Sequence, residues 1–541
     1  MYDLHESFLR REEFKNIGIQ VPDFDYEALV KRTYDHPIWV HFGGGNLFRA
    51  FHSSLQQGLI QQGEADKGII VIDTYDDEII DRIFHKNNNL SLNVIMKGND
   101  ELEKEVIASV TESHYFSENN RSSWNRVKEI FRNPSLQMVT LTITEKGYNL
   151  KDTEGKLSEI VRKDIDAGPA HSRHTMSQLC YLLWERYQNG AYPIAIVSTD
   201  NIPRNGQTLK NAVLDIANLW QKKGFVDSDF IDNYLLNRQK VSFPWSMIDR
   251  IVPSPSEKVA QQLVESGFGD TEIFVTKKHT VTAPFVNTEE VNYLVIEDHF
   301  PNGRPPLEKA GVYFTNRETV DKAERMKVYT CLNPIHTTMA VFGCMLGYNS
   351  IADETNDPEI KKLIEKVGFD EGLPVVSDPG IINPVTFLNE FLYKRLPNKN
   401  IPDTPQRITT DTSQKIKSIY GQTIQLYKEK AGQLQFIPLS IAGWLRYLMG
   451  MDDQGNSITL SPDPMMDYLQ KHLQAIHFGD PESVADHLYP VLSNKQIFGV
   501  DLYQVHLGRK IEKFVKEMIS HKGAVRATLK KYLYDEKEES S

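Results

Sequence analysis

Short apolar runs recur through the first part of the chain and alternate with stretches of helical spacing. Runs with the length and composition of buried strands are PIWVHF (37–42), GIIVID (68–73), LQMVTLTI (136–143) and YPIAIVS (192–198). Apolar residues recur every three or four positions at 47–63 and at 175–188, which is the period of a helix. Strands that alternate with helices predict an α/β domain with a Rossmann-like parallel sheet.

The second part of the chain has helical spacing throughout. The segments with this spacing are 317–348, 358–368, 384–396, 410–431, 437–450, 464–476, 483–493 and 500–520. A loop rich in Pro and Gly, FPNGRPPLEKAG (300–311), separates the two parts and reads as a boundary. We therefore expect an α/β domain over residues 1–300 and an all-helical domain over residues 301–541, with the site between them.

Two local patterns complete this outline. Residues 90–115 alternate between apolar and polar positions on either side of Gly98-Asn99-Asp100, which predicts a hairpin with its turn at those three residues. The terminal run YDEKEESS (534–541) is charged and polar, which predicts a disordered tail.

Composition and charge narrow the class of protein. The 541 residues include 61 Lys and Arg against 73 Asp and Glu, so the net charge of −12 argues against nucleic acid as a partner. The three cysteines, Cys180, Cys331 and Cys344, have no paired spacing, so the sequence predicts neither a disulfide framework nor a zinc site. The charged first residues and the lack of any long apolar run predict a soluble, cytoplasmic protein without membrane partners.

A glycine-rich turn follows the first strand. Gly43 and Gly45 separate it from a helix, and such a turn lets backbone N–H groups and the helix N-terminus approach a pyrophosphate. The second strand ends in Asp73, whose carboxylate can bind the ribose hydroxyls of an adenosine and repel a 2′-phosphate, which favours NAD over NADP. The alternative is that Asp73 only caps a helix or closes a turn.

The stretch MKVYTCLNPIHTTMAVFGCMLGY (326–348) holds the candidate chemistry. Lys327, Asn333 and His336 precede an apolar helix, and a lysine, an amide and an imidazole together can move a proton and polarise a carbonyl. The alternative is a set of solvated or internally satisfied polar groups. Asn333 and His336 share a helix face, but nine positions from Lys327 to His336 place these two on opposite sides of a regular helix. With Pro334 in the segment, we expect a break or a π-type bulge near 329–333.

This stretch resembles the K-x(4)-N-x-x-H signature of the polyol-specific long-chain dehydrogenases, the mannitol dehydrogenase family, with one extra residue before Asn333. The first glycine loop also resembles that of the family. Four further runs in family order carry the resemblance: TEKGY (144–148), STDNIPRNG (198–206), FPWSMIDRIVP (243–253) and RLPNKNIPDTPQRITTDTSQK (395–415).

The resemblance implies a role for each matched position. Lys327 is implied to be the general acid/base, with Asn201 and Asn333 stabilising the oxyanion and His336 orienting the reacting oxygen. The cofactor-binding positions that it implies are Gly43, Gly45, Asn46, Arg49, Asp73, Thr144, Glu145 and Lys146. The substrate-binding positions are Asp249, Arg395 and Lys415. The sequence also allows Glu145–Lys146 to be a surface pair, the STDN run a strand-end turn, Asp249–Arg250 an internal ion pair, and the cations of 395–415 salt bridges between helices.

The activity that the resemblance implies is a metal-independent, NAD-dependent and reversible oxidation of a linear sugar acid or polyol. The chain length and the CLNPIHT variant favour the hexuronate branch of the family, which predicts oxidation of D-mannonate to D-fructuronate. The alternatives are reduction of tagaturonate and 2-oxidation of mannitol. An inactive NAD-binding sensor or scaffold is the alternative of another class, and a phosphogluconate-type 3-hydroxyacid dehydrogenase lacks support from the TEKGY and STDN runs. We expect a monomer or a small homo-oligomer.

Overall fold

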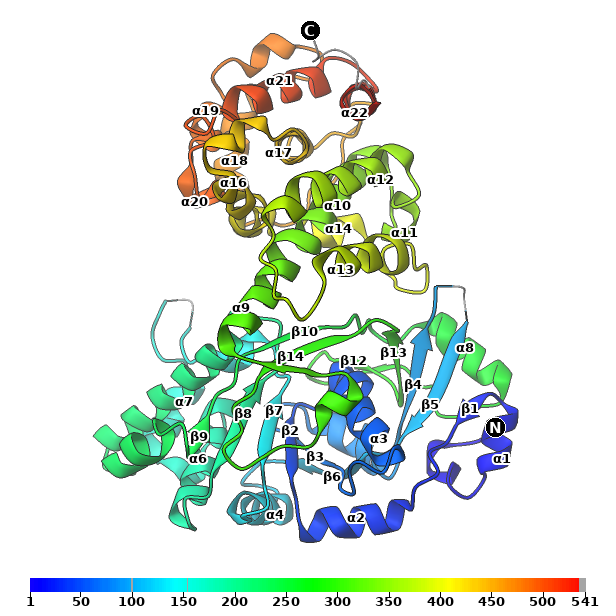
Figure 1. The fold of residues 1–541 in the computed structure, drawn as a ribbon, viewed down its shortest axis with the longest axis vertical. Helices are drawn as coiled ribbons and strands as arrows, with labels where there is room; N and C mark the ends of the chain where they lie inside the picture. The colour runs from blue at the N-terminus through cyan, green and yellow to red at the C-terminus, as the bar shows by residue number, and fades with distance from the viewer. Residues whose placement is uncertain (99–100, 153, 535–541) are drawn as a thin grey trace. The chain divides into compact units, whose positions relative to one another are not determined.

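The computed structural model describes residues 1–98, 101–152 and 154–534, which form two compact units, Met1–Asp321 and Lys322–Ser541 (Figure 1). The chain passes from one unit to the other within helix α9 (Arg317–Met326), later than the loop at 300–311. The reason is that strand β15 (Tyr313–Thr315), beyond that loop, still pairs in parallel with β14 (Tyr293–Glu297) of the first unit. Asn99 and Asp100 of the expected hairpin turn, and the tail from residue 535, lie outside the described residues.

A six-stranded parallel sheet organises the first unit. Its order is β6-β3-β2-β7-β8-β9. These strands span Val110–Tyr115, Ile69–Asp73, Trp39–Phe42, Met138–Leu141, Ile194–Ser198 and Val241–Ser242. The strand of this sheet that comes first in the chain, β2, lies between β3 and β7, so the order reverses direction there, as in the doubly wound dinucleotide-binding folds. Ligands of such sheets bind beyond the carboxyl ends of the strands at this switch point.

Both faces of the sheet are covered, which is why its strands read as nearly continuous apolar runs. One face packs against helices α4 (Arg121–Arg132), α5 (Glu159–Ala167), α6 (Thr175–Gln188) and α7 (Asn205–Lys222). Figure 1 shows α6 and α7 beside the β8–β9 end of the sheet. The other face packs against the π-helix Phe48–His52, helix α3 (Ser53–Gln61), the π-helix Ile79–His85 and strands β10 (Ser246–Asp249) and β14.

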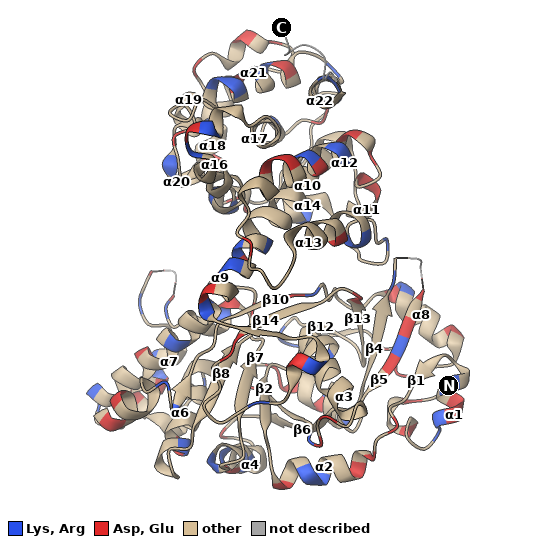
Figure 2. Cartoon of the chain, in the orientation of Figure 1, with Lys and Arg blue, Asp and Glu red and all other residues tan. Residues whose placement is uncertain are grey.

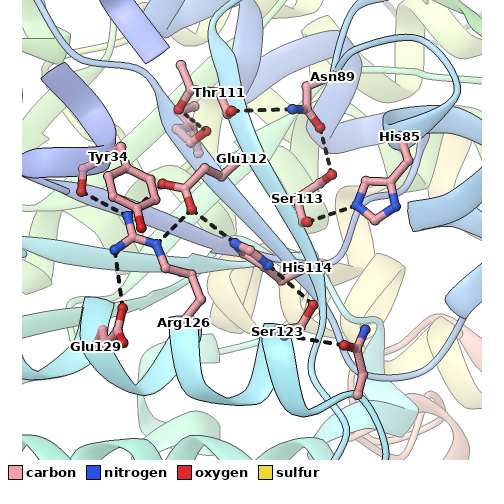
Figure 3. Close-up of polar contacts among 12 residues, drawn as sticks. Tyr34, His85, Asn89, Thr111, Glu112, Ser113, His114, Ser123, Arg126 and Glu129 are labelled. Carbon is pink, nitrogen blue, oxygen red and sulfur yellow. Dashed lines mark hydrogen bonds and ion pairs between the residues drawn. The ribbon is translucent and has the colours of Figure 1, made fainter. Parts of the chain in front are cut away.

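A polar network fastens helix α4 to the edge strand β6 (Figure 3). Glu112 of β6 accepts two hydrogen bonds from the Arg126 guanidinium, at 2.9 and 2.8 Å, and its carboxylate lies 3.0 Å from the His114 ring. Burial raises the pKa of Glu112, but the hydrogen bonds from Arg126 and His114 outweigh it and hold that pKa below its ordinary value. The ion pair therefore stays charged and fixes the end of the sheet.

Smaller sheets surround the main one. Strands β1 (Ile19–Gln20), β5 (Leu102–Ile107), β4 (Ser91–Met96) and β13 (Phe285–Glu289) form a four-stranded sheet in which β4 and β5 are the expected antiparallel hairpin. Strand β10 pairs with β14, and β11 (Phe274–Val275) pairs with β12 (Val281–Thr282). Further α-helices of the first unit are α1 (Arg11–Asn16), α2 (Tyr26–Asp35) and α8 (Glu257–Ser266).

The second unit is helical over its described residues. Its longer helices are α10 (Asn333–Leu346), α12 (Pro358–Glu365), α13 (Pro384–Glu390), α16 (Gln422–Tyr427), α17 (Phe436–Tyr447), α18 (Met466–Leu473), α21 (Gly508–Ile519) and α22 (Ala524–Tyr534). The apolar helices α10 and α17 pack directly on each other. A Cβ at Gly443 of α17 would lie 2.5 Å from the Phe342 ring of α10, so glycine permits this close approach.

The surface helices carry charges of both signs, as Figure 2 shows along α2 and α12. Across residues 1–98, 101–152 and 154–534, no helix combines the length and the apolar character that crossing a bilayer requires.

Candidate active site

A cavity of about 760 Å³ lies at the switch point of the main sheet, within the first unit. The residues that line it come from loops at the carboxyl ends of the strands, from the start of helices α5 and α6, and from one hairpin. They include Gly43, Gly45, Asp73, Tyr75, Asp76, Tyr115, Phe116, Thr142, Thr144, Lys146, Arg173, His174, Gln178, Lys278 and Thr280. The volume and the position suit a nucleotide-sized ligand.

The glycine turn forms one wall of this cavity. Gly43 has φ +103°, and a Cβ there would lie 2.3 Å from the Thr142 carbonyl oxygen, so no other residue fits. The helix that follows begins directly after Gly45, whose carbonyl accepts a hydrogen bond from Arg49 N–H at 3.2 Å. Backbone N–H groups and a helix N-terminus are therefore available to an anionic ligand.

Asp73 lies at the end of β3 and is 7% exposed. Its carboxylate accepts hydrogen bonds from the backbone N–H groups of Gly44, Tyr75 and Asp76, at 3.1, 2.8 and 2.9 Å. Burial raises its pKa, and these three bonds oppose the shift. Asp73 therefore closes the turn, which was the alternative prediction. It also lines the cavity, which is compatible with the predicted cofactor-binding role.

The TEKGY and STDN runs meet through a single carboxylate. Asp200 accepts hydrogen bonds from the N–H groups of Ile143 and Thr144, at 3.0 and 2.9 Å, and from the Tyr148 hydroxyl at 2.6 Å. Thr144 has φ +62° and ψ 163°, a conformation that essentially only glycine adopts without strain. Asp200 thus holds a strained turn at the cavity wall and fixes the loop that carries Asn201.

Not every predicted cofactor residue lines the cavity. Arg49 is buried and donates hydrogen bonds to Ala283 O, the Thr282 hydroxyl and the Asn46 side chain, at 2.8, 2.9 and 2.8 Å. Asn46 and Arg49 therefore join the glycine turn to the β12–β13 segment. Glu145 is exposed next to Thr144 and is not among the lining residues, whereas Lys146 is.

The expected irregularity beside Lys327 is present in the second unit. Residues Lys327–Cys331 form a π-helix, Leu332 departs from helical geometry at φ −121° and ψ −68°, and α10 begins at Asn333. The prediction of a π-type break is thereby confirmed, and the extra residue of the signature is absorbed in a wide turn. Lys327 is 3% exposed.

Two other predicted residues of the second unit share a neighbour. The His336 ring packs edge-on against Phe391, with ring centroids 5.1 Å apart, and the Arg395 guanidinium lies 5.5 Å from the centroid of the same ring. Lys415 is exposed, and its ammonium donates a hydrogen bond to Thr410 O at 2.7 Å.

The first unit holds the remaining predicted residues. Asn201 is exposed in the loop after β8, and Asp249 is buried at the end of β10. Sequence reasoning did not single out the cavity residues of the 115–119, 172–178 and 278–280 segments. Of these three segments, only 115–119 could have been recognised from the sequence, because it follows a strand of the parallel sheet.

Comparisons with known proteins agree with this architecture. The family model of the mannitol dehydrogenase Rossmann domain matches residues 37–309, and that of the mannitol dehydrogenase C-terminal domain matches residues 319–519. The chain belongs to the mannitol dehydrogenase family. The two matched ranges follow the division of this family member into an α/β unit and a helical unit, so the expected fold class is confirmed.

Several relatives resemble this mannitol dehydrogenase family member along most of their length. D-mannonate oxidoreductase of Thermotoga maritima is 52% identical over 530 residues, which cover 97% of each chain. D-mannonate oxidoreductase of Escherichia coli is 28% identical and covers 90% of this chain and 93% of its own. Among solved structures, the ternary complex of Pseudomonas fluorescens mannitol 2-dehydrogenase with NAD and D-mannitol has a TM-score of 0.68 at 24% identity and covers 96% of this chain and 97% of its own.

Proposed function

We propose that this protein is an NAD-dependent oxidoreductase that interconverts D-mannonate and D-fructuronate. The observation that carries the proposal is the 52% identity over 530 residues to the D-mannonate oxidoreductase of Thermotoga maritima. The cavity at the switch point supports it, because its position and volume suit a dinucleotide.

The cavity residues fit NAD. Gly43 lets the turn pass close to Thr142 at the cavity wall, and the helix that starts after Gly45 offers its N-terminus to a pyrophosphate. Asp73 suits the adenosine ribose and disfavours a 2′-phosphate. When bound, NAD supplies the nicotinamide ring that accepts a hydride from the substrate carbon.

The remaining roles belong to the protein's own side chains. Lys327 takes the proton of the hydroxyl group that is oxidised, and the amides of Asn201 and Asn333 stabilise the oxyanion without titrating. His336 orients the reacting oxygen. Asp249, Arg395 and Lys415 bind the distant hydroxyl groups and the carboxylate of the open-chain substrate, for which Arg and Lys are suitable partners.

Two other functions have specific but weaker support. Mannitol 2-dehydrogenase of Neosartorya fischeri is 27% identical over 528 residues, which makes mannitol the second candidate substrate. An inactive nucleotide sensor is disfavoured, because the π-helix at Lys327–Cys331 accommodates the one extra residue that set the lysine apart from the family signature. The cytoplasmic location and the monomeric or small homo-oligomeric state stay predictions from the sequence.

A substrate panel tests the choice. Initial rates of NADH oxidation with fructuronate, tagaturonate and fructose should rank fructuronate first by kcat/KM. Fastest turnover of fructose would reject the assignment in favour of a mannitol dehydrogenase, and fastest turnover of tagaturonate would move the protein to the other hexuronate.

Replacement of Lys327 by Ala tests the catalytic assignment. We expect kcat to fall by roughly 10³-fold, because a positioned acid/base contributes about 10²–10⁴-fold to such reactions. NADH binding, followed by its fluorescence, should change little, because the nucleotide cavity lies in the other unit. Lys522→Ala, at an exposed lysine before α22, is the control and should keep the wild-type rate. A wild-type rate in Lys327→Ala would refute the role of the lysine.

A further inference from the structure

The β11–β12 hairpin forms one side of the nucleotide cavity. Thr276 closes the hairpin's turn, because its N–H donates to Thr280 O at 3.0 Å and its hydroxyl oxygen accepts from the N–H groups of Lys278 and Thr280, at 3.2 and 3.1 Å. His279 at the tip has φ +65°, a left-handed backbone conformation that reverses the chain direction in the turn. The hydrogen bonds of the turn fix the backbone position of Lys278, from which its side chain extends.

Contacts on both strands hold this hairpin in place. The Thr276 hydroxyl donates to Asp76 Oδ2 at 2.6 Å, and both residues are 3% exposed. Within the turn, Lys277 N–H donates to Glu78 Oε2 at 2.7 Å. On the other strand, the Arg49 guanidinium reaches Thr282 and Ala283. The hairpin is therefore fastened both to the loop that follows Asp73 and to the helix that follows the glycine turn.

Lys278 presents its charge to the cavity. The side chain lines the cavity together with Thr280, Gly43 and Gly45, and its ammonium lies 4.7 Å from the centroid of the Tyr75 ring. The lining residue Arg173 pairs with Glu118 at 3.3 Å. Lys278 differs, because in the described part of the chain no carboxylate lies within ion-pair distance of its ammonium. A positive charge on a rigid turn thus faces the cavity without a protein anion to neutralise it.

We propose that Lys278 binds the pyrophosphate of the dinucleotide, so that the β11–β12 hairpin acts as a cationic clamp opposite the glycine turn; this inference rests on the proposed binding of NAD. The phosphate in question is the pyrophosphate and not a 2′-phosphate, because Asp73, the residue assigned to the adenosine ribose, lines the same cavity and repels an anion there. Neutral glycine turns bind pyrophosphate through N–H groups alone, and an ammonium adds a charge-assisted hydrogen bond to them.

The test compares two neighbouring lysines. Lys278→Met keeps the length of the side chain and removes its charge, and Lys277→Met does the same at an exposed residue of the turn that does not line the cavity. For Lys278→Met we expect the Kd of NADH and the Ki of ADP-ribose to rise by about 10-fold. Inhibition by adenosine, which has no phosphate, should be unchanged, and so should kcat at saturating NADH. Lys277→Met should match the wild type throughout.

Each other outcome has a definite meaning. An unchanged Kd of NADH in Lys278→Met overturns the clamp. Equal losses of adenosine and ADP-ribose binding also overturn it, because the lysine would then act on the nucleoside or on the fold. A greater loss for NADPH than for NADH assigns the lysine to a 2′-phosphate and overturns the pyrophosphate assignment. Wild-type protein that binds no NADH refutes the proposed function itself, which separates that failure from the failure of the clamp.

Discussion

Two buried carboxyl groups of the α/β unit differ in their partners from Glu354 of the helical unit. In the α/β unit, Asp73 and Asp200 each accept three hydrogen bonds, five of the six from backbone N–H groups. In the helical unit, Glu354 on α11 (Ile351–Glu354) is fully buried, and neither of its carboxyl oxygens has a hydrogen-bond partner among the described residues. All three side chains are buried, so they differ in their hydrogen-bond partners and not in their exposure to water.

Backbone geometry explains this difference. Loops at the carboxyl ends of parallel strands leave N–H groups unpaired, whereas a helix uses its own except in the first turn. Glu371 illustrates the helical solution, because it accepts hydrogen bonds from the N–H groups of Gln435, Phe436 and Ile437 where α17 begins. Burial raises the pKa of all four acids, but only Glu354 lacks opposing hydrogen bonds, and burial together with Asp403 and Asp357 raises its pKa to about 9.

Removal of Asp200 should have the largest effect on stability. Asp200→Ala leaves the N–H groups of Ile143 and Thr144 and the Tyr148 hydroxyl without their acceptor, and we expect a loss of roughly 4 kcal/mol in the free energy of unfolding. NADH binding should also weaken, because the Thr144 turn lines the cavity. Urea denaturation and NADH titration measure the two effects. A change below about 1 kcal/mol would show that the carboxylate does not support the turn.

Glu354 should make the stability of the protein depend on pH. Its folded-state pKa of about 9 lies above the unfolded value, so between roughly pH 4.5 and pH 9 the folded chain keeps a proton that the unfolded chain has lost. Stability therefore falls as pH rises through this window, by up to about 1.4 kcal/mol per pH unit, or about 3 kcal/mol from pH 6 to pH 8.

Glu354→Gln isolates that contribution, because the amide keeps the shape and does not titrate. Chemical denaturation at pH 6 and pH 8 should show a smaller fall in stability for the variant than for the wild type. Parallel pH profiles for the two proteins would mean that Glu354 is already charged in the folded state, and the contrast between the units would then disappear.

Thr144 should give the smallest effect, in the stabilising direction. Asp200 holds Thr144 at φ +62° and ψ 163°, and glycine adopts this conformation without strain. We expect Thr144→Gly to raise the free energy of unfolding by about 1 kcal/mol, after the loss of backbone entropy is included. A matched Thr142→Gly variant, at a residue without positive φ, should be destabilised, and destabilisation of Thr144→Gly would mean that the turn is not strained.

The apolar pattern and the spacing of residues along the chain predicted several strands, the glycine turn and the π-helix. The apolar runs predicted four of the six strands of the main sheet, β2, β3, β7 and β8, and the glycine turn and Asp73 followed from where two of those strands end. The π-helix at Lys327–Cys331 also followed from the sequence, because an extra residue and a nearby proline conflict with a regular helix. These features depend on neighbours in the chain, which a sequence displays directly.

Only the tertiary structure decided which distant groups meet. It turned Arg49 toward Thr282 and Ala283, joined Asp200 to the Thr144 turn, and brought Lys278 into the same cavity lining as the glycines. It likewise left Glu354 without a donor among the residues that the structure describes. The physical reason is that a side chain's partners depend on which N–H and C=O groups the packed backbone leaves unpaired, and no local pattern contains that information.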